Sequence, residues 1–260
     1  MKPTDFVTYR LDMKADMFDT LSRSVDFEAI TSGRQGNHLV DVSERGVPIV
    51  RTTTQYKRPA HHFAPIHHQI TDAIQRAASA QFGALSFNNA LIELYDRNYI
   101  KMGYHSDQAL DLEPGSFIAL YSCYERPKAH ASLRTLKIKS KTTHEETALV
   151  LEHNGVVLFS LETNRQYAHK IVLTPPPSPH STEPDNRWLG ITFRSSKTYI
   201  QFREHRPYLT DGTVLQLADE AQRKAFYRLR GQENRQMDFS YPNTLHYTIS
   251  LADTLEPKGP

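Results

Sequence analysis

Residues 90–107 read ALIELYDRNYIKMGYHSD, and this stretch sets the expected fold class. An apolar run at 90–95 and a second one at 99–104, separated by a polar turn, predict two strands joined as a hairpin. His105 and Asp107 follow at the end of the second strand. Because alternate residues of a strand point to the same face, the imidazole and the carboxylate are expected side by side.

Further strands are expected as far as residue 193. The runs are short, apolar and separated by polar turns, and they cover 117–124, 133–138, 148–151, 156–159, 169–173 and 189–193. Apolar residues at helical spacing predict helices at 66–80 and at 217–231, the second ended by Gly231. The chain is therefore expected to be mainly β with flanking helices, as an all-β barrel or a jelly roll.

Size and composition favour a folded chain. Its 260 residues suffice for one large domain or two small ones, and the 38% hydrophobic content allows a real core. The proline-rich segment 174–187, TPPPSPHSTEPDNR, predicts a long exposed loop, because proline removes a backbone donor and fixes φ. Residues 253–260 are expected to form a disordered tail.

Several classes of protein are disfavoured by composition. The one cysteine, Cys123, argues against a disulfide framework and against a cysteine-rich zinc site. The chain shows no secretory signal and no run of 18 apolar residues, so we expect no membrane span and a cytoplasmic or nuclear location. The net charge of +2 identifies no partner, and nothing in the sequence indicates an obligate protein partner.

A third metal-binding side chain is expected from the strand at 169–173. His169 begins this run, and a barrel or jelly roll can bring it beside His105 and Asp107. Two histidines and one carboxylate form a facial triad, a ligand set that suits Fe(II) in oxygenases because it leaves coordination positions open. His144-Glu145-Glu146 has a similar spacing, but it lies among polar residues and predicts a solvated turn.

Four segments together resemble the AlkB-like branch of the 2-oxoglutarate and Fe(II)-dependent dioxygenases. They occur in the family's order and spacing, and they are 90–95, His105-Ser106-Asp107, 154–169 and 188–194. The resemblance implies a double-stranded β-helix (jelly-roll, cupin-like) core, with a substrate-lid or support region at 1–87 and the catalytic core with its C-terminal helix at 88–252. It also implies that His105, Asp107 and His169 are the catalytic iron ligands.

The resemblance extends to the co-substrate, with informative departures. It implies that Tyr95, Thr192 and Arg194 bind 2-oxoglutarate. Glu93 stands where the family has asparagine, and Trp188 and Gly190 replace the first arginine and the asparagine of its Arg-x-Asn-x-Thr-x-Arg strand. Arg187 is one residue out of register and needs a bulge to point inward. The binding of the second carboxylate of 2-oxoglutarate is therefore left open.

The implied activity uses Fe(II), 2-oxoglutarate and O2 to hydroxylate a C–H bond, with succinate and CO2 as products. The resemblance favours oxidative dealkylation of alkylated single-stranded DNA or RNA. Lys137, Lys139 and Lys141 alternate and are expected to line one strand face that neutralises phosphates. The segment 51–63 resembles the substrate lid in position, and Tyr99, Tyr104 and Trp188 are candidates to stack on a flipped base.

Two alternatives remain open at this stage. The same chemistry could act on a protein side chain or a small metabolite, or the chain could be a catalytically impaired, cupin-like binding module.

Overall fold

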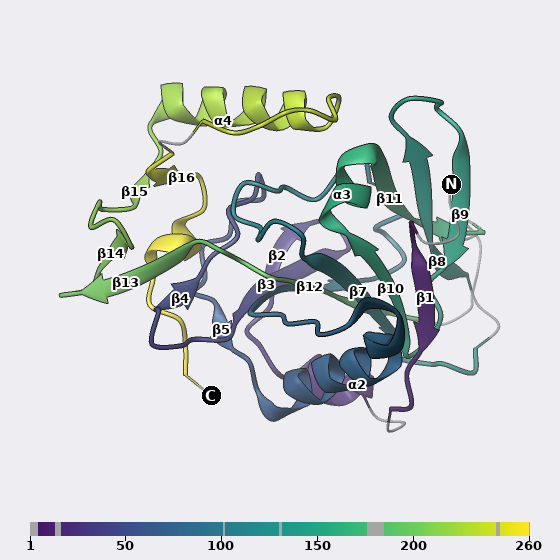
Figure 1. The fold of residues 1–260 in the computed structure, drawn as a ribbon. Helices are drawn as coiled ribbons and strands as arrows, with labels where there is room; N and C mark the ends of the chain where they lie inside the picture. Colours follow the sequence, from purple (N-terminus) through teal and green to yellow (C-terminus); the bar gives the residue numbers. More distant parts are fainter. Residues whose placement is uncertain are drawn as a thin grey trace.

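The structure is a computed structural model, and it describes residues 5–13, 17–100, 102–129, 132–175, 185–242 and 245–259. Two antiparallel β-sheets face each other (Figure 1). The major sheet has the strand order β1 (Val7–Arg10), β10 (Gly155–Ser160), β7 (Phe117–Tyr124), β12 (Trp188–Arg194), β6 (Asn89–Tyr95), β3 (Arg34–Val40) and β2 (Glu28–Thr31). The strand β5 (His61–His62) also pairs with β3, in parallel. The minor sheet consists of β11 (Tyr167–Thr174), β8 (Leu133–Ser140) and β9 (Glu146–Val150).

Smaller elements surround the two sheets. Short strands form the groups β4 (Val47–Pro48), β13 (Tyr199–Arg203) and β14 (Arg206–Leu209), and β15 (Gln216–Leu217) with β16 (Tyr247–Thr248). The helices are α1 (Met17–Leu21), α2 (Pro65–Phe82), α3 (Leu161–Gln166) and α4 (Glu220–Glu233), with a 3-10 turn at Leu251–Thr254. Figure 1 shows α2 and α4 on opposite sides of the molecule.

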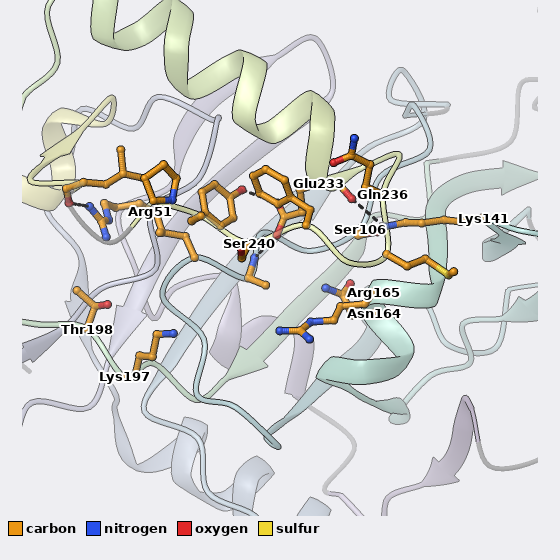
Figure 2. A pocket seen from close by; sticks show the side chains of 17 residues that line it. Arg51, Ser106, Lys141, Asn164, Arg165, Lys197, Thr198, Glu233, Gln236 and Ser240 are labelled. Carbon is orange, nitrogen blue, oxygen red and sulfur yellow. Dashed lines mark hydrogen bonds between the residues drawn. The ribbon is translucent and has the colours of Figure 1, made fainter.

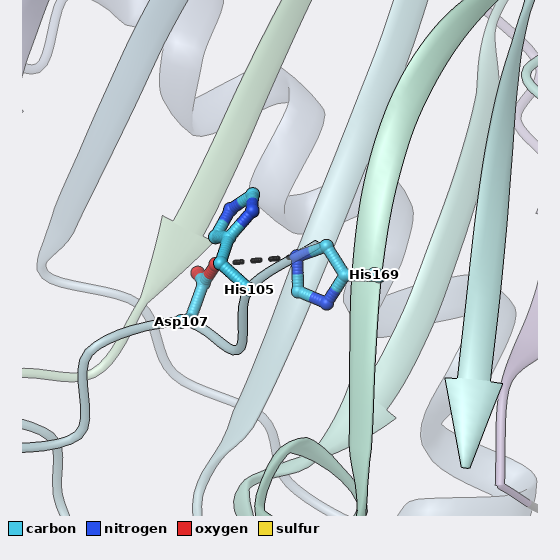
Figure 3. Close-up of side chains that lie close together, drawn as sticks. All are labelled: His105, Asp107 and His169. Atoms are coloured by element: carbon cyan, nitrogen blue, oxygen red, sulfur yellow. Dashed lines mark ion pairs between the residues drawn. The ribbon is translucent and has the colours of Figure 1, made fainter. Parts of the chain in front are cut away.

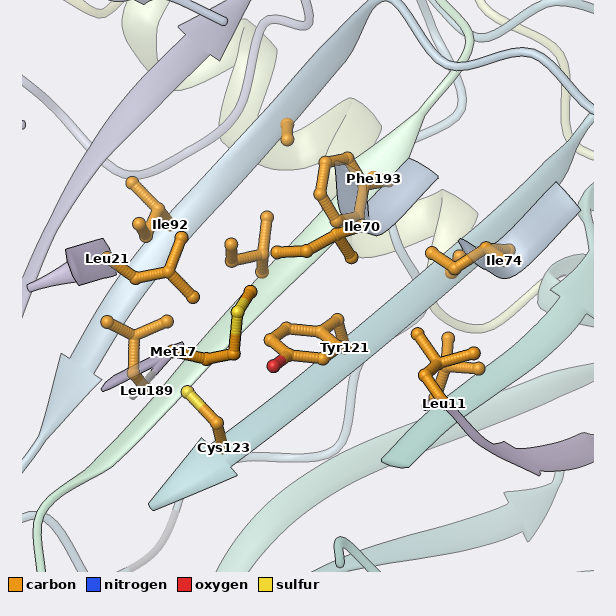
Figure 4. Packing of buried hydrophobic residues seen from close by; sticks show 14 of the residues in the cluster. Leu11, Met17, Leu21, Ile70, Ile74, Ile92, Tyr121, Cys123, Leu189 and Phe193 are labelled. Atoms are coloured by element: carbon orange, nitrogen blue, oxygen red, sulfur yellow. The ribbon is translucent and has the colours of Figure 1, made fainter. Parts of the chain in front are cut away.

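The core has two layers, one on each face of the major sheet. On the outer face, Ile70 and Ile74 of α2 pack in the same cluster as Phe193 and Tyr121 of the sheet (Figure 4). On the inner face, the major and minor sheets enclose a second cluster that includes Leu120 of β7 and Leu136 of β8. Two packed sheets around one inner core confirm the expected jelly-roll class, mainly β with flanking helices.

The helix expected at 66–80 is confirmed as α2. Pro65 begins it, where a missing N–H costs nothing. The backbone N–H of Ala64 donates to Nδ1 of His67 at 2.9 Å, which caps the first turn from within. Gly83 ends the helix with φ +73°, a conformation that glycine adopts without strain.

The hairpin expected after β6 is wrong. Both edges of β6 are already occupied, by β3 and by β12, so no edge remains for a strand at 99–104. Arg134 instead binds the backbone of the turn, donating to the carbonyls of Asp96 (2.7 Å) and Tyr99. None of the described residues between 99 and 104 lies in a strand.

Two predicted ends also differ. Gly231 does not end α4, because the helix continues to Glu233 and its C-cap is Asn234. The expected disordered tail is ordered as far as Gly259. Asp253 is buried, and Lys258 pairs with the chain at Ala60 and His62 through backbone hydrogen bonds of 2.8 and 3.0 Å.

Part of the N-terminal region belongs to the main sheet. The sequence assigned residues 1–87 to a lid or support region, and β3 from this region pairs along its full length with β6. The proline-rich loop expected at 174–187 lies mostly outside the described residues, at 176–184. Within the described part of the chain, no helix combines the length and the apolar character needed to cross a membrane.

Candidate active site

His105, Asp107 and His169 meet at one end of the space between the two sheets (Figure 3). One ligand atom from each side chain lies within 4.8 Å of those of the other two. Nε2 of His169 is 3.4 Å from Oδ1 of Asp107. The two imidazole rings have centroids 4.8 Å apart. The three groups that the sequence singled out are therefore adjacent in space.

Backbone pairing brings His105 beside His169 of β11, although His105 does not lie on a strand. His105 and His169 exchange two backbone hydrogen bonds of 3.0 and 2.7 Å as an isolated antiparallel bridge. Asp107 is fixed by Asn164 of α3, whose side-chain oxygen accepts from the Asp107 N–H at 2.7 Å and whose amide donates to the Asp107 carbonyl at 2.8 Å. The sequence expected His105 and Asp107 on a strand, whereas they lie on a loop held by side chains.

The end of α4 also holds this loop, which sequence reasoning did not find. The guanidinium of Arg230 donates to the carbonyl of Ser106, and the side-chain oxygen of Asn234 accepts from the Ser106 N–H at 3.0 Å. Glu233 accepts from the N–H of Ala109 at 2.7 Å and pairs with Arg230 at 2.5 Å. Of these residues only Arg230 lies in the helix predicted at 217–231, because that prediction ended at Gly231, before Glu233 and Asn234.

The protonation states suit a metal site. Burial, together with the neighbouring His169, lowers the pKa of His105 to about 3, so its ring is neutral at pH 7. Burial opposes ionisation of Asp107, but the hydrogen bond with His169 and the charge of Arg194 hold its pKa below the ordinary value. Metal ligands must be neutral imidazoles and ionised carboxylates, and both conditions are met by these two groups.

Several buried polar atoms here have no hydrogen-bond partner among the described residues. They are Oδ2 of Asp107, Nδ1 of His169, and Nε and Nη2 of Arg194. Arg194 is 3% exposed, and its Nη1 lies 3.9 Å from Oδ2 of Asp107. Buried polar groups in proteins are nearly always paired, so these atoms mark a place where ligands fit. The donor set fits a divalent metal and an anion beside it.

The three groups open into a cavity of about 570 Å³ between the sheets. Its lining includes Tyr95, Thr192 and Arg194, the three residues expected to bind the co-substrate. Such a volume is typical of small-molecule sites. Thr52, Thr53 and Thr54 also line it, so part of the expected lid segment borders the cavity, whereas Tyr56 of the same segment is fully buried.

The loop that carries His105 and Asp107 separates this cavity from a second one. The second cavity has a volume of about 390 Å³ and is bordered by Lys141, Arg165, Glu233 and Tyr241 (Figure 2). His105, Asp107 and His169 do not line it, but Ser106 does. His105 and Asp107 therefore line one cavity and the residue between them lines the other.

Arg187, Trp188 and Gly190, at the start of β12, are the positions where the sequence left doubt. Arg187 pairs with Glu125 at 2.7 Å and does not line the cavity of about 570 Å³. Trp188 is buried, and its indole N–H donates to Oγ of Ser122. The indole ring lies over Gly190, where an added Cβ would come within 2.0 Å of it. The two departures from the family motif on this strand therefore depend on each other.

One charged pair in the cavity was missed by sequence reasoning. Arg34 of β3 contacts Glu93 of β6 through Nη2 at 2.5 Å and through Nε at 2.7 Å. The Tyr95 hydroxyl donates to the other carboxylate oxygen of Glu93 at 2.8 Å. Residues 1–60 are weakly patterned, so only the pairing of β3 with β6 reveals Arg34 as a cavity residue.

A jelly roll with a partly buried set of two histidines and a carboxylate defines a class of metal-dependent oxygenases. The sequence matches the family model of the 2OG-Fe(II) oxygenase superfamily over residues 40–194. The chain belongs to this superfamily, and it is a 2-oxoglutarate-dependent dioxygenase that uses Fe(II), 2-oxoglutarate and O2.

One solved structure shows the same fold at low sequence identity, and a second is a more distant match. OsALKBH1 matches with a TM-score of 0.50 and 14% identity over 75% of this chain and 100% of that chain. A Pseudomonas putida prolyl-4-hydroxylase matches with a TM-score of 0.42 and 11% identity over 74% of this chain and 93% of that chain. No curated protein matches the sequence. The AlkB-like resemblance is confirmed at the level of superfamily and fold.

Proposed function

We propose that this oxygenase removes alkyl groups from nucleic acid bases by hydroxylation, with Fe(II) held by His105, Asp107 and His169. The observation that carries the proposal is the cluster of unpartnered buried atoms on Asp107, His169 and Arg194 at one end of the cavity. These atoms are placed to meet a cation and an anion at neighbouring positions.

The residues of the chain would divide the work as follows. Asp107 would supply the negative charge of the iron site, and His105 and His169 would supply its nitrogen ligands. Bound Fe(II) activates O2 at the expense of 2-oxoglutarate, which becomes succinate and CO2. Arg194 would hold a carboxylate of 2-oxoglutarate beside the metal, since its Nε and Nη2 have no partner among the described residues. Thr192 and Tyr95 line the path between the two ends of the co-substrate.

The reaction accounts for both oxygen atoms. One atom of O2 enters the succinate formed from 2-oxoglutarate, and the other enters the C–H bond of the alkyl group. A hydroxymethyl group on a ring nitrogen then leaves as formaldehyde, and the nitrogen recovers its proton. The α4 contacts to Ser106 and Ala109 would keep the iron-binding loop in place during these steps.

A nucleic acid substrate is supported by basic and aromatic groups near the cavity. Lys137 and Lys170 are cross-strand neighbours on β8 and β11. The ammonium groups of Lys170 and Lys139 lie 4.1 and 5.8 Å from the ring centre of Tyr104, which lines the cavity. We call Lys137, Lys139 and Lys170 the basic patch. Such a patch can neutralise phosphates while a flipped base enters a pocket.

The expected lysine stripe needs one correction. Lys141 follows the end of β8, and its ammonium group donates to the backbone carbonyl of Glu233 at 2.9 Å. It is half-buried beside the second cavity, so it does not extend the strand face of Lys137 and Lys139. Lys170 takes its place in the basic patch.

The test measures succinate and formaldehyde release with Fe(II), 2-oxoglutarate and a single-stranded oligonucleotide that carries N-methylated bases. We expect equal amounts of both products, and only background succinate with the unmethylated oligonucleotide. Asp107→Ala should release neither product. Succinate without formaldehyde, at a rate that the methylated oligonucleotide does not change, would refute the nucleic acid substrate and favour a protein or metabolite. No succinate under any condition would refute the iron site.

A further inference from the structure

Arg34 is a second guanidinium inside the cavity, on a strand that the motif does not include. 2-Oxoglutarate carries two carboxylates, and the motif position that usually supplies a second arginine is occupied here by Trp188. Among the described residues that line the cavity, the arginines are Arg34, Arg194 and Arg230. Arg230 is engaged by Glu233 and by the carbonyl of Ser106. Arg34 is therefore the remaining candidate for the second carboxylate.

The strand register places Arg34 opposite the motif position. Tyr95 pairs with Arg34 on one side and with Trp188 on the other, so the three residues form one row across β3, β6 and β12. A side chain from β3 thus approaches the Tyr95 end of the cavity from the flank opposite Trp188. The arginine therefore lies two strands away from the motif position, on β3 instead of β12, but in the same row of the sheet.

The rows also fix the order of groups along the cavity. Gly36, Glu93 and Gly190 form the next row, Leu91 and Thr192 lie in the one after, and Arg194 lies one row further. Successive rows are two residues, or about 6.6 Å, apart along the strands. Because the Arg34 guanidinium contacts Glu93, it reaches back to the second row. The row of Arg194 lies two such steps from that of Glu93, and a five-carbon diacid is comparable in length to one step, so the side chains of Arg34 and Arg194 have to cover the rest of the distance.

Trp188 and Gly190 explain why the charge comes from β3. The indole occupies the space over Gly190 and donates to Ser122, so β12 presents no cation at this end. The Tyr95 ring lies between Trp188 and Tyr99, at centroid distances of 4.8 and 4.6 Å. The guanidinium carbon of Arg34 lies 5.8 Å from the centre of the Tyr99 ring. Arg134 lies 5.3 Å from the centre of the Tyr95 ring but donates to the carbonyls of Asp96 and Tyr99 and does not line the cavity, so Arg34 is the cavity-lining arginine at this end.

We propose that Arg34 binds the distal carboxylate of 2-oxoglutarate and that Glu93 positions it. The inference rests on the proposed function, which places the keto-acid end of the co-substrate beside the iron ligands and Arg194. Glu93 engages Nε and Nη2 of Arg34, and a guanidinium has five N–H donors, so donors remain for a second carboxylate. The Tyr95 hydroxyl, now bonded to Glu93, is a second donor at the same end.

Glu93 makes the Arg34 end of the cavity select between ligands that carry a carboxylate there and ligands that do not. Its charge balances Arg34 while the cavity is empty, so no uncompensated charge is buried. A ligand carboxylate has to share Arg34 with Glu93, whereas a methyl group at the same position gains nothing from Arg34. The pair therefore discriminates by the chemistry of the distal group.

The experiment compares two ligands that differ only at that group. 2-Oxoglutarate and 2-oxopentanoate have the same five-carbon chain, which ends in a carboxylate or in a methyl group. Their affinities are measured by calorimetry on the Fe(II)-loaded protein without O2. In Arg34→Met we expect 2-oxoglutarate to bind roughly 10–100-fold more weakly, the range for one charge-assisted partner. 2-Oxopentanoate should change less than threefold.

Controls separate this role from a structural one. Arg187→Met removes an arginine that pairs with Glu125 away from this cavity, and it should change neither affinity. Because Arg34→Met leaves Glu93 unpaired, Arg34→Met with Glu93→Met replaces the whole pair by apolar groups, which proteins tolerate well. This double variant should show the same loss of preference for 2-oxoglutarate.

The outcomes distinguish the inference from the proposed function. If either Arg34 variant keeps the parent's preference for 2-oxoglutarate, or loses affinity for both ligands equally, the role of Arg34 is refuted while the iron site stands. If the parent binds neither ligand, or binds them as well after Asp107→Ala, the proposed function itself fails.

Discussion

The two ends of the cavity treat their polar groups in opposite ways. At the iron end, Asp107, His169 and Arg194 each keep buried atoms without a partner among the described residues. At the other end, Arg34, Glu93 and Tyr95 are bonded to one another. A chain that leaves buried atoms unpaired loses stability at that place, and the loss is recovered when a ligand binds. The end with His169, Asp107 and Arg194 has unpaired groups that the proposed ligands would satisfy, whereas the Arg34 end is paired without one.

This difference tells us what each mutation should cost. Changes at the end with unpaired groups (Asp107, His169 and Arg194), which we call the open end, should abolish ligand binding and leave the fold nearly intact. Changes at the end where Arg34, Glu93 and Tyr95 are paired, which we call the closed end, should lower the stability of the fold as well as affect ligand binding.

The largest effect is expected for Asp107→Ala, which removes the anionic group of the proposed iron site. Turnover and iron content should fall by more than the roughly 10–100-fold that follows the loss of a residue supporting a metal ligand. Iron analysis and succinate release measure the two effects. The exposed His144→Ala, from the other histidine-carboxylate spacing, should change neither. Full iron occupancy in Asp107→Ala would show that Asp107 is not an iron ligand and that the unpaired atoms at this end do not mark a metal site.

Arg194→Lys should have the next largest effect. A lysine keeps the charge but loses the two-pronged geometry of the guanidinium. Losing one hydrogen bond to a charged group costs roughly 1.5–3 kcal/mol, so the 2-oxoglutarate concentration for half-maximal rate should rise at least tenfold. Arg187→Ala is the control. A silent Arg194→Lys together with a crippling Arg187→Ala would mean that the register of β12 is wrong by one residue.

Glu93→Gln tests the closed end. The amide still accepts a hydrogen bond but no longer balances Arg34, so the free energy of unfolding of the ligand-free protein should fall by about 1–3 kcal/mol. 2-Oxoglutarate should then raise the melting temperature more in the variant than in the parent, because Arg34 lacks its own carboxylate. A variant that melts lower and gains no more from the ligand would show that this end does not face the co-substrate.

The smallest effect is expected on the basic patch. Changing Lys137, Lys139 and Lys170 to glutamine should weaken oligonucleotide binding severalfold and reduce the slope of affinity against salt by up to about 2, at about 0.7 for each phosphate contact with a single strand. Binding at several salt concentrations measures both. Lys224→Gln, a 71% exposed lysine of α4, is the matched control. An unchanged slope in the triple variant would leave these lysines as an ordinary solvated face.

Patterns among neighbouring residues predicted most of the fold. The strands from β6 to β12 and the helix α2 follow from the spacing of apolar residues within each segment, which does not depend on distant parts of the chain. Arg194 was placed correctly on the cavity face because a strand alternates its side chains without exception between bulges. The same reasoning doubted Arg187, which the structure places in a pair with Glu125.

Long-range pairing accounts for what the sequence did not predict. The hairpin after β6 was expected from residues 90–104, but the edges of β6 were taken by β3 and β12, one from far upstream and one from far downstream. Arg34 enters the cavity through this same pairing with β3. Asp253 and Lys258 were expected in a disordered tail, because nothing in the local composition reveals their contacts with Thr248 and Ala60.

The contact between Trp188 and Gly190 constrains the order in which this chain could have changed during evolution. With the indole in its present place, any residue other than glycine at 190 would clash with it, because its Cβ would lie 2.0 Å from the ring. A lineage that moved from arginine and asparagine at these positions to tryptophan and glycine, one substitution at a time, had to acquire Gly190 first. Reversion is equally ordered: Trp188 must give way before any larger residue can return to position 190.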